Sequence, residues 1–116
     1  MRTTTEVIHD HLKKRLDGDV DGDLGNYDQS VVQLTGSGVY RGHDGVRACA
    51  AELARLVGEV EFVYSHTLID GDFAYLEWRA HDRTVHVCDG ADSFVVRDGL
   101  IVLQTIRYTP TPAPRQ

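Results

Sequence analysis

The stretch Phe73-Ala-Tyr-Leu-Glu-Trp-Arg-Ala-His81 decides the fold class of this chain. Its apolar and polar residues alternate, which is typical of a β-strand with one buried face and one exposed face. The residues predicted to face inward are Ala74, Leu76, Trp78 and Ala80. A sheet with one apolar face needs a cover, so we expect helices to pack against these side chains.

Runs rich in β-branched and aromatic residues fill the second half of the chain, at 60–69, 73–81, 84–96 and 100–109. Asp70-Gly71 and Asp98-Gly99 separate neighbouring runs, and Asp-Gly is a strong hairpin signal because glycine adopts the left-handed backbone of a tight turn. The runs therefore predict an antiparallel meander. In the last run both alternating sets are about equally apolar, so periodicity does not decide which set faces inward.

The first half of the chain predicts the helices that cover the sheet. Apolar residues recur at helical spacing over 4–16 and again over 44–58, where Asp44 can cap the helix. A short helix is predicted near 19–24, and a small hairpin around the glycine-rich turn at 35–38. This order is typical of an α+β domain whose helices lie on one face of a curved antiparallel sheet and leave one pocket for a small molecule.

Composition excludes several classes of function. With 116 residues, 41% of them hydrophobic, the chain can bury a core, and no apolar run approaches the ~18 residues of a membrane span. Its net charge is −6, and its basic residues form no stripe beyond 13–15, so we expect no binding to nucleic acid or membrane. The N-terminus lacks the apolar segment of a secretory signal, so we expect a cytoplasmic protein.

The sequence also gives no sign of a metal or a cofactor. Cys49 and Cys88 lie far apart and form no metal-binding or disulfide pattern, and the six histidines lack metal-ligand spacing. Nucleotide-binding and nucleophilic-serine motifs do not occur. We expect a single domain over 1–109. The prolines of 110–116 predict a flexible tail that neither pairs in a sheet nor continues a helix.

Three residues are candidates for proton transfer. Asp92 precedes Phe94 on the predicted inner face, where burial would raise the pKa of its carboxyl and make it a proton donor. His86 shares that parity, unless Asp89-Gly90 inserts a bulge, and His11 lies at the margin of the first helix's apolar stripe. The alternatives are a turn aspartate bonded to backbone amides, a strand histidine facing solvent or a partner subunit, and a histidine at a helix edge.

The order and spacing of several stretches resemble the nuclear-transport-factor-2-like superfamily, in particular its SnoaL-like polyketide cyclase and ketosteroid-isomerase branch. These stretches are GDVDGDL at 18–24, YDQSVV at 27–32, YRGHDGVR at 40–47, DGDFAYLEW at 70–78 and ADSFVVRDGLI at 91–101. The resemblance implies a cone-shaped sheet with three helices, a pocket at the wide end, and a homodimer formed through the outer surface of the sheet. It places Gln104, Ile106 and Tyr108 inside the cone.

The same resemblance suggests roles for two candidates. Asp92 matches the position of a pocket acid, and His11 that of a helix tyrosine in the isomerases. The chain departs from the family at the isomerase base, because no carboxylate stands near Thr35. It departs as well from the epoxide hydrolases of this superfamily, which need Arg-x-Asp on one strand and an aspartate on the last strand. The corresponding residues here are Arg79-x-His81 and Ile106.

Together these observations predict a homodimer that binds a small apolar molecule and performs isomerisation, cyclisation or dehydration by acid/base chemistry without a cofactor. Asp92, His11 and His86 are the predicted catalytic residues. The predicted substrate-binding residues are Tyr64, Trp78, Phe94, Gln104, Ile106 and Tyr108. The alternative is a non-catalytic ligand-binding or assembly module. Apart from Asp92 we identify no inward carboxylate in the sequence, and this favours the alternative.

Overall fold

A computed structural model describes residues 1–57 and 61–114. The helices are α1 (Thr4–Asp17), α2 (Val20–Asp23), a 3₁₀ turn (Leu24–Asn26) and α3 (Gly42–Val57). The strands are β1 (Tyr27–Thr35), β2 (Gly38–Arg41), β3 (Glu61–Asp70), β4 (Phe73–His81), β5 (Val85–Arg97), β6 (Leu100–Arg107) and β7 (Pro110–Pro112). These bounds lie within a few residues of the predicted ones, and the expected end of the third helix at Gly58 lies outside the described residues.

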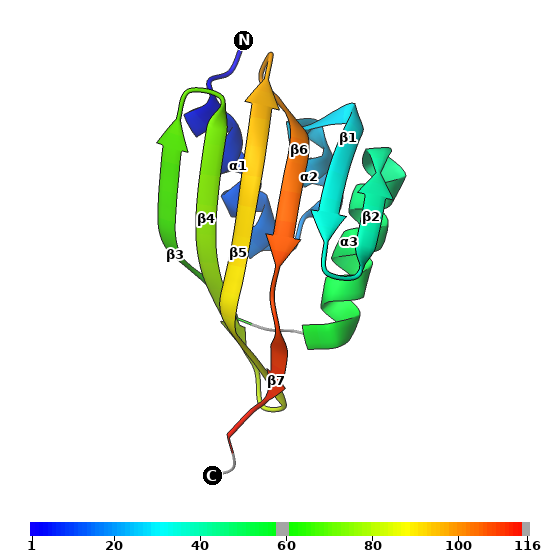
Figure 1. Cartoon of the computed structure of the whole chain (residues 1–116), viewed down its shortest axis with the longest axis vertical. Coiled ribbons are helices and arrows are strands. Elements are labelled where there is room, and N and C mark those ends of the chain that lie inside the picture. Colours follow the sequence, from blue (N-terminus) through cyan, green and yellow to red (C-terminus); the bar gives the residue numbers. More distant parts are fainter. Residues whose placement is uncertain (58–60, 115–116) are drawn as a thin grey trace.

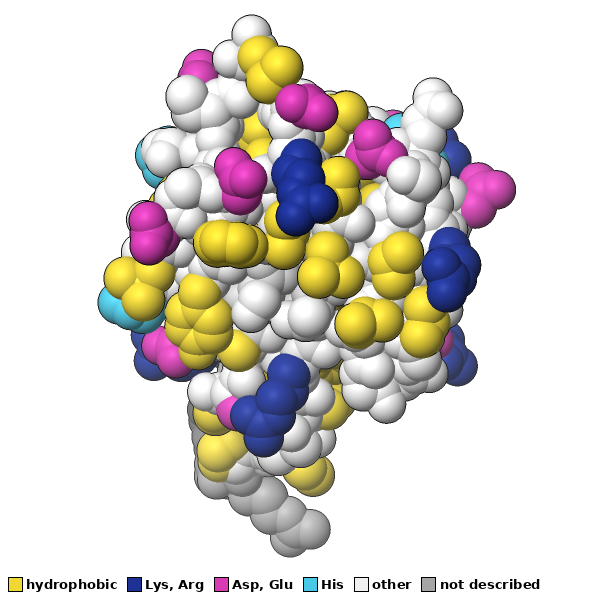
Figure 2. Space-filling view, turned by 45° about the horizontal axis from the view of Figure 1, so that its top comes forward, with side chains coloured by type: hydrophobic (Ala, Val, Ile, Leu, Met, Phe, Trp, Pro, Cys, Tyr) yellow, Lys and Arg dark blue, Asp and Glu magenta, His cyan; other side chains and the backbone are white. Residues whose placement is uncertain are grey.

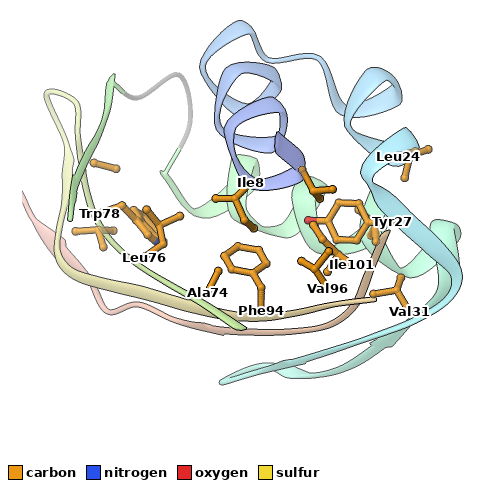
Figure 3. Close-up of a cluster of buried hydrophobic side chains, with 14 of the residues drawn as sticks. Ile8, Leu24, Tyr27, Val31, Ala74, Leu76, Trp78, Phe94, Val96 and Ile101 are labelled. Carbon is orange, nitrogen blue, oxygen red and sulfur yellow. The ribbon is translucent and has the colours of Figure 1, made fainter. Parts of the chain in front are cut away.

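The described strands form one curved, unclosed sheet with the order β2-β1-β6-β5-β4-β3, and β7 pairs with β5. The described helices lie on one side of the sheet, behind it as drawn in Figure 1, and Figure 3 shows the helix that carries Ile8 over the concave face. The predicted α+β class is therefore confirmed. The sheet is not antiparallel throughout, because β1 runs parallel to β6. A parallel pair requires a long connection, which here contains β2, α3 and the β3–β5 meander.

The core fills the space between α1 and the concave face of the sheet. Ile8 of α1 lies above Phe94 of β5, and Leu76 and Trp78 line the curve of β4 (Figure 3). Ala74, Leu76, Trp78 and Ala80 are all buried, so the predicted inner face of β4 is confirmed. Arg79 and His81, which alternate with them, are exposed.

Two bulges set which residues of β5 and β6 face inward. Ala80 pairs with Val87 but Trp78 pairs with Gly90, so β5 carries one extra residue between these pairs. The bulge turns His86 to the outer face while Asp92 stays inside. The inferred shared face of His86 and Asp92 is therefore wrong. In β6 a similar shift at Val102 brings both Ile101 and Gln104 inside, which simple alternation does not allow.

The ends of two elements differ from the sequence prediction. Thr3 and Glu6 form the N-terminal cap of α1. The helix α3 already begins at Gly42, so Asp44, the predicted cap, lies in its first turn. The segment Pro110–Pro112 pairs with Val85–Val87 at the end of β5, so the expectation that the tail cannot pair in a sheet is wrong for these residues. Proline is tolerated there because β7 is a short edge strand. No helix in the described residues is both long and apolar enough to span a membrane.

Candidate active site

A pocket lies between α1, α3 and the concave face of the sheet. Residues from every layer line it, and those predicted from the sequence are His11, Tyr64, Trp78, Asp92, Gln104 and Ile106. The cavity volume is about 50 Å³, which is room for on the order of four water molecules. Pockets for drug-sized ligands are several times larger. The pocket as it stands therefore suits a compact molecule or one end of a longer one.

Asp92 lies on the wall of this pocket and is only 7% exposed. Its Oδ1 accepts a hydrogen bond from Nε1 of Trp78, and its Oδ2 accepts one from Nε2 of Gln104, both at 3.0 Å. Burial raises the pKa of the Asp92 carboxyl, because the loss of hydration outweighs these two hydrogen bonds and the positive potential of His11 and Arg15. The predicted position of Asp92 on the inner face is confirmed.

Two glutamines extend the contacts of Asp92 across the sheet. Oε1 of Gln104 accepts hydrogen bonds from the hydroxyl of Tyr27 at 2.7 Å and from Nε2 of Gln33 at 2.8 Å. Burial raises the pKa of the Tyr27 hydroxyl well above its ordinary value, so this group keeps its proton and acts as a donor. Gln33 was missed in the sequence, because glutamine inside a short strand is usually exposed.

The second half of the site is a buried pair formed by His11 of α1 and Asp23 of α2. Nδ1 of His11 lies 3.0 and 2.9 Å from the two carboxylate oxygens of Asp23. An ionised carboxylate only accepts hydrogen bonds, so Nδ1 carries a proton and Nε2 is the ring nitrogen left for the pocket. The His11 ring also packs edge-on against Phe94, with 5.3 Å between centroids.

Asp23 is held by further side chains. Nδ2 of Asn26 donates to Oδ1 of Asp23 at 3.0 Å and to Oδ2 of Asp10 at 2.8 Å, while Arg2 donates to Oδ1 of Asn26. Asp23 is thus a second carboxylate in the pocket, and the sequence-based view that Asp92 stands alone is wrong. In the sequence nothing distinguishes Asp23 from Asp19, which caps α2. The two differ only in where their side chains point: that of Asp23 is buried beside His11, whereas that of Asp19 caps α2.

Three predicted residues do not line the pocket. His86 lies on the outer face beside His81, with 5.8 Å between ring centroids. Phe94 is buried and packs against His11, and Tyr108 packs against Trp78, with 5.7 Å between centroids. Phe94 and Tyr108 therefore support the wall, while His86 is remote from it.

The lining of the pocket also includes a cation, Arg15. Arg15 lies over the ring of Phe62, 5.4 Å from its centroid, and approaches Tyr64. Burial raises the pKa of Tyr64 to about 12, against the effect of Arg15, and raises the pKa of Cys49 to about 11. Tyr64 and Cys49 therefore stay protonated at neutral pH. Within residues 1–57 and 61–114, no group of three His, Cys, Asp or Glu side chains is placed to hold a metal ion.

Solved structures with the same fold are numerous. A candidate ketosteroid isomerase from Kribbella flavida is similar with a TM-score of 0.79 and 14% identity, covering 97% of this chain and 82% of that one. A candidate polyketide cyclase from Sinorhizobium meliloti gives a TM-score of 0.70 and 16% identity, covering 87% and 93%. TerC, co-crystallized with polyporic acid, gives 0.77 and 18%, covering 91% of each chain. At these identities the likeness shows the fold alone.

Comparison with curated proteins gives no significant match. The family model described as the SnoaL-like domain matches residues 9–104, which include most of α1, the strands β1 to β5, part of β6 and every polar residue of the pocket named above. This match spans most of the chain. The protein therefore belongs to the SnoaL-like domain family.

Proposed function

We propose that this protein is a cofactor-free isomerase, cyclase or dehydratase that acts by acid/base chemistry on a small, largely apolar carbonyl compound. The observation that carries this proposal is the buried Asp92 carboxyl, whose pKa is raised, in a pocket that also holds the His11–Asp23 pair. Groups with perturbed pKa values in a pocket are typical of acid/base sites. Structural neighbours named as a candidate ketosteroid isomerase and a candidate polyketide cyclase support this class of chemistry.

In the proposed mechanism Asp92 is the acid. When Oδ2 is protonated, it still accepts the hydrogen bond from Gln104 and directs its own O–H into the pocket, while Oδ1 keeps the bond from Trp78. A neutral carboxyl can then donate a hydrogen bond to the oxyanion that develops on the substrate. The apolar walls strengthen this interaction because they exclude water.

His11 is the proposed base. Because Nδ1 is held by Asp23, the neutral ring has its lone pair on Nε2, and Nε2 can take a proton from the carbon next to the substrate carbonyl. The imidazolium that forms is stabilised by the Asp23 carboxylate. Asp23 is a positioning residue in this scheme, since it acts through His11. Return of the proton to another carbon, or loss of a hydroxyl, would complete the reaction.

One observation favours the alternative of a non-catalytic ligand-binding module. Both oxygens of Asp92 already have protein donors, and a fully bonded network of this kind also stabilises an inert pocket. Turnover separates the two possibilities, because binding alone moves no hydrogen from carbon.

A ligand screen followed by an exchange assay tests the proposal. A ligand present at 100 times its Kd raises the free energy of unfolding by about 2.7 kcal/mol, so steroids, polyketide intermediates and terpenoids can be screened by thermal shift. Binders are then incubated with the protein in D₂O. We expect deuterium at the carbon next to the carbonyl, seen by NMR or mass spectrometry. Tight binding without exchange for every carbonyl compound would support the non-catalytic alternative.

The role of Asp23 can be tested with Asp23→Asn. The neutral amide still accepts from His11 but no longer stabilises the imidazolium, so we expect kcat to fall by a factor of about 10² with little change in KM. The pH profile of kcat should shift as well, which a purely structural role would not cause. Asp21→Asn is the matched control, since Asp21 is on the same helix with its side chain 83% exposed. Equal kcat values for the two variants would contradict the role of Asp23.

We further propose that the outer face of the sheet forms a homodimer. Leu68 of β3 and Phe73 of β4 are 55% and 60% exposed there, and together with Val95 and Leu103 they line a broad apolar groove. Figure 2 shows hydrophobic side chains gathered on one face of the molecule, with charged side chains mainly around them. Apolar grooves of this kind are typical of protein interfaces.

Leu68→Glu tests the dimer. A carboxylate buried against an apolar partner surface lacks a counter-ion, so we expect the variant to be a folded monomer where the wild type is a dimer. Val39→Glu is the control, because Val39 is 57% exposed on the edge strand β2, outside the groove. Light scattering after size-exclusion chromatography gives the masses. A monomeric wild type, or a dimeric Leu68→Glu variant, would argue against this interface.

A further inference from the structure

Among the described residues, only the NH₂ group of the Gln33 side-chain amide has a hydrogen-bond partner. Gln33 lies on β1 with 3% exposure, and its Nε2 donates to Gln104. Its Oε1 is buried as well, yet no donor among the described residues reaches this atom. A buried carbonyl oxygen without a partner costs about 1–3 kcal/mol, so native proteins rarely leave one unpaired without a reason.

The orientation of this amide follows from its neighbours. Nε2 of Gln104 faces Oδ2 of Asp92, and Oε1 of Gln104 accepts from Tyr27. Gln33 must therefore present its NH₂ group to Gln104, since a flipped amide would bring two carbonyl oxygens together. The free end of Gln33 is thus an acceptor, and its orientation depends on the same network that holds Asp92.

Gln33 lines the same pocket as Asp92 and His11. Oε1 has almost no accessible surface of its own, so a hydroxyl or N–H group on a bound molecule would reach it from the pocket with a small shift of the Gln33 side chain. We infer that the molecule bound here carries a hydrogen-bond donor that binds Oε1 of Gln33, in addition to the oxygen that meets Asp92. The substrate class is therefore a hydroxylated or amino-substituted carbonyl compound. This inference rests on the proposed function for the position of the carbonyl, but the donor subsite itself does not depend on turnover.

The subsite is tested with three related probes, namely 3-hydroxyacetophenone, 3-fluoroacetophenone and acetophenone. All three have the carbonyl oxygen, but only the first has a donor. We expect the wild type to bind the hydroxyl compound about tenfold more tightly than the other two, because the alternative leaves a buried acceptor unpaired. Equal affinities for the three probes, or no binding of 3-hydroxyacetophenone, would overturn the inference. Equal affinities are also the result expected if a water molecule, rather than the ligand, satisfies Oε1.

Gln33→Met assigns the preference to this residue, because methionine has nearly the same length and no polar end. We expect the tenfold preference to disappear in the variant, and a preference that persists would place the donor subsite elsewhere. If the variant does not fold, the ¹³C shift of the Gln33 side-chain carbonyl in the wild type gives the same information. That resonance should move with the hydroxyl probe and not with the fluoro probe.

The outcome can be separated from that of the proposed function. In Asp23→Asn the hydroxyl preference should remain, because Asp23 bonds to His11 and Asn26 and has no part in the Gln104 network that orients Gln33. A hydroxyl preference without deuterium exchange would refute the catalytic proposal and keep the subsite. Deuterium exchange without any hydroxyl preference would keep catalysis and refute the subsite.

Discussion

Asp92→Asn is expected to lower kcat by a factor of roughly 10²–10⁴ while leaving the protein folded. The activity falls because an amide N–H is a far weaker acid than a carboxyl O–H, so it gives less stabilisation to the developing oxyanion. At neutral pH the amide removes the cost of burying an ionised carboxyl, but its NH₂ group meets one of the two N–H donors bound by Asp92, that of Trp78 or that of Gln104, so the two effects on stability oppose each other.

The sign of the pH dependence follows from the direction of the pKa shift. The pKa of Asp92 in the folded protein is raised above its ordinary value of 3.8, so the folded state binds the proton more tightly than the unfolded chain. The free energy of unfolding should therefore fall as the pH rises from about 3.8 to the folded pKa. It should not fall in this way in Asp92→Asn. Urea unfolding between pH 3 and pH 8 measures the difference.

Asp89→Asn is the matched control, because Asp89 lies on the same strand but is bonded to Thr109 outside the pocket. Those hydrogen bonds lower the pKa of Asp89, so its contribution to stability is present above the ordinary pKa and is lost as the pH falls. We expect this control to lose stability at neutral pH and to keep kcat. The prediction for Asp92 fails if Asp92→Asn keeps its kcat, or if its free energy of unfolding falls with rising pH as that of the wild type does.

Gly90→Ala is expected to destabilise the fold by about 3 kcal/mol or more and to disturb the pocket. A Cβ added at Gly90 would lie 2.3 Å from Cδ2 and 2.4 Å from Cε2 of Trp78, and 2.7 Å from the Trp78 carbonyl oxygen. The backbone contact means that rotation of the indole alone does not relieve the clash. Trp78 must move, and its hydrogen bond to Asp92 is expected to break.

The measurement uses the single tryptophan of the chain. Fluorescence of Trp78 should shift to longer wavelength in Gly90→Ala as the indole becomes more hydrated, and the urea midpoint should decrease. Gly36→Ala is the control, because a Cβ at Gly36 meets no atom within 4 Å. A Gly90→Ala variant as stable as this control, with unchanged fluorescence, would show that β5 accommodates a side chain at the bulge.

Local pattern determined most of the architecture of this protein. The alternation over Phe73–His81 predicts which face of β4 is buried, because successive side chains of a strand point to opposite sides. Asp-Gly at 70–71 and 98–99 predicts both hairpins, and Gly71, Asp98 and Gly99 indeed adopt positive φ angles. The inward position of Asp92 also follows from parity counted from Phe94. Each of these properties depends on residues close together in the chain.

Only the tertiary structure decided the polar half of the site. Asp23 meets His11 because α2 turns back against α1, and Gln33 meets Gln104 because β1 runs parallel to β6. No local pattern in the sequence relates these pairs of segments. The bulge before Gly90 separates His86 from Asp92 by shifting the register against β4, which depends on the space beside Trp78. Pairing of Pro110–Pro112 with β5 likewise depends on a neighbouring edge. Periodicity within a segment gives its faces, whereas contacts between segments depend on the packing of the whole chain.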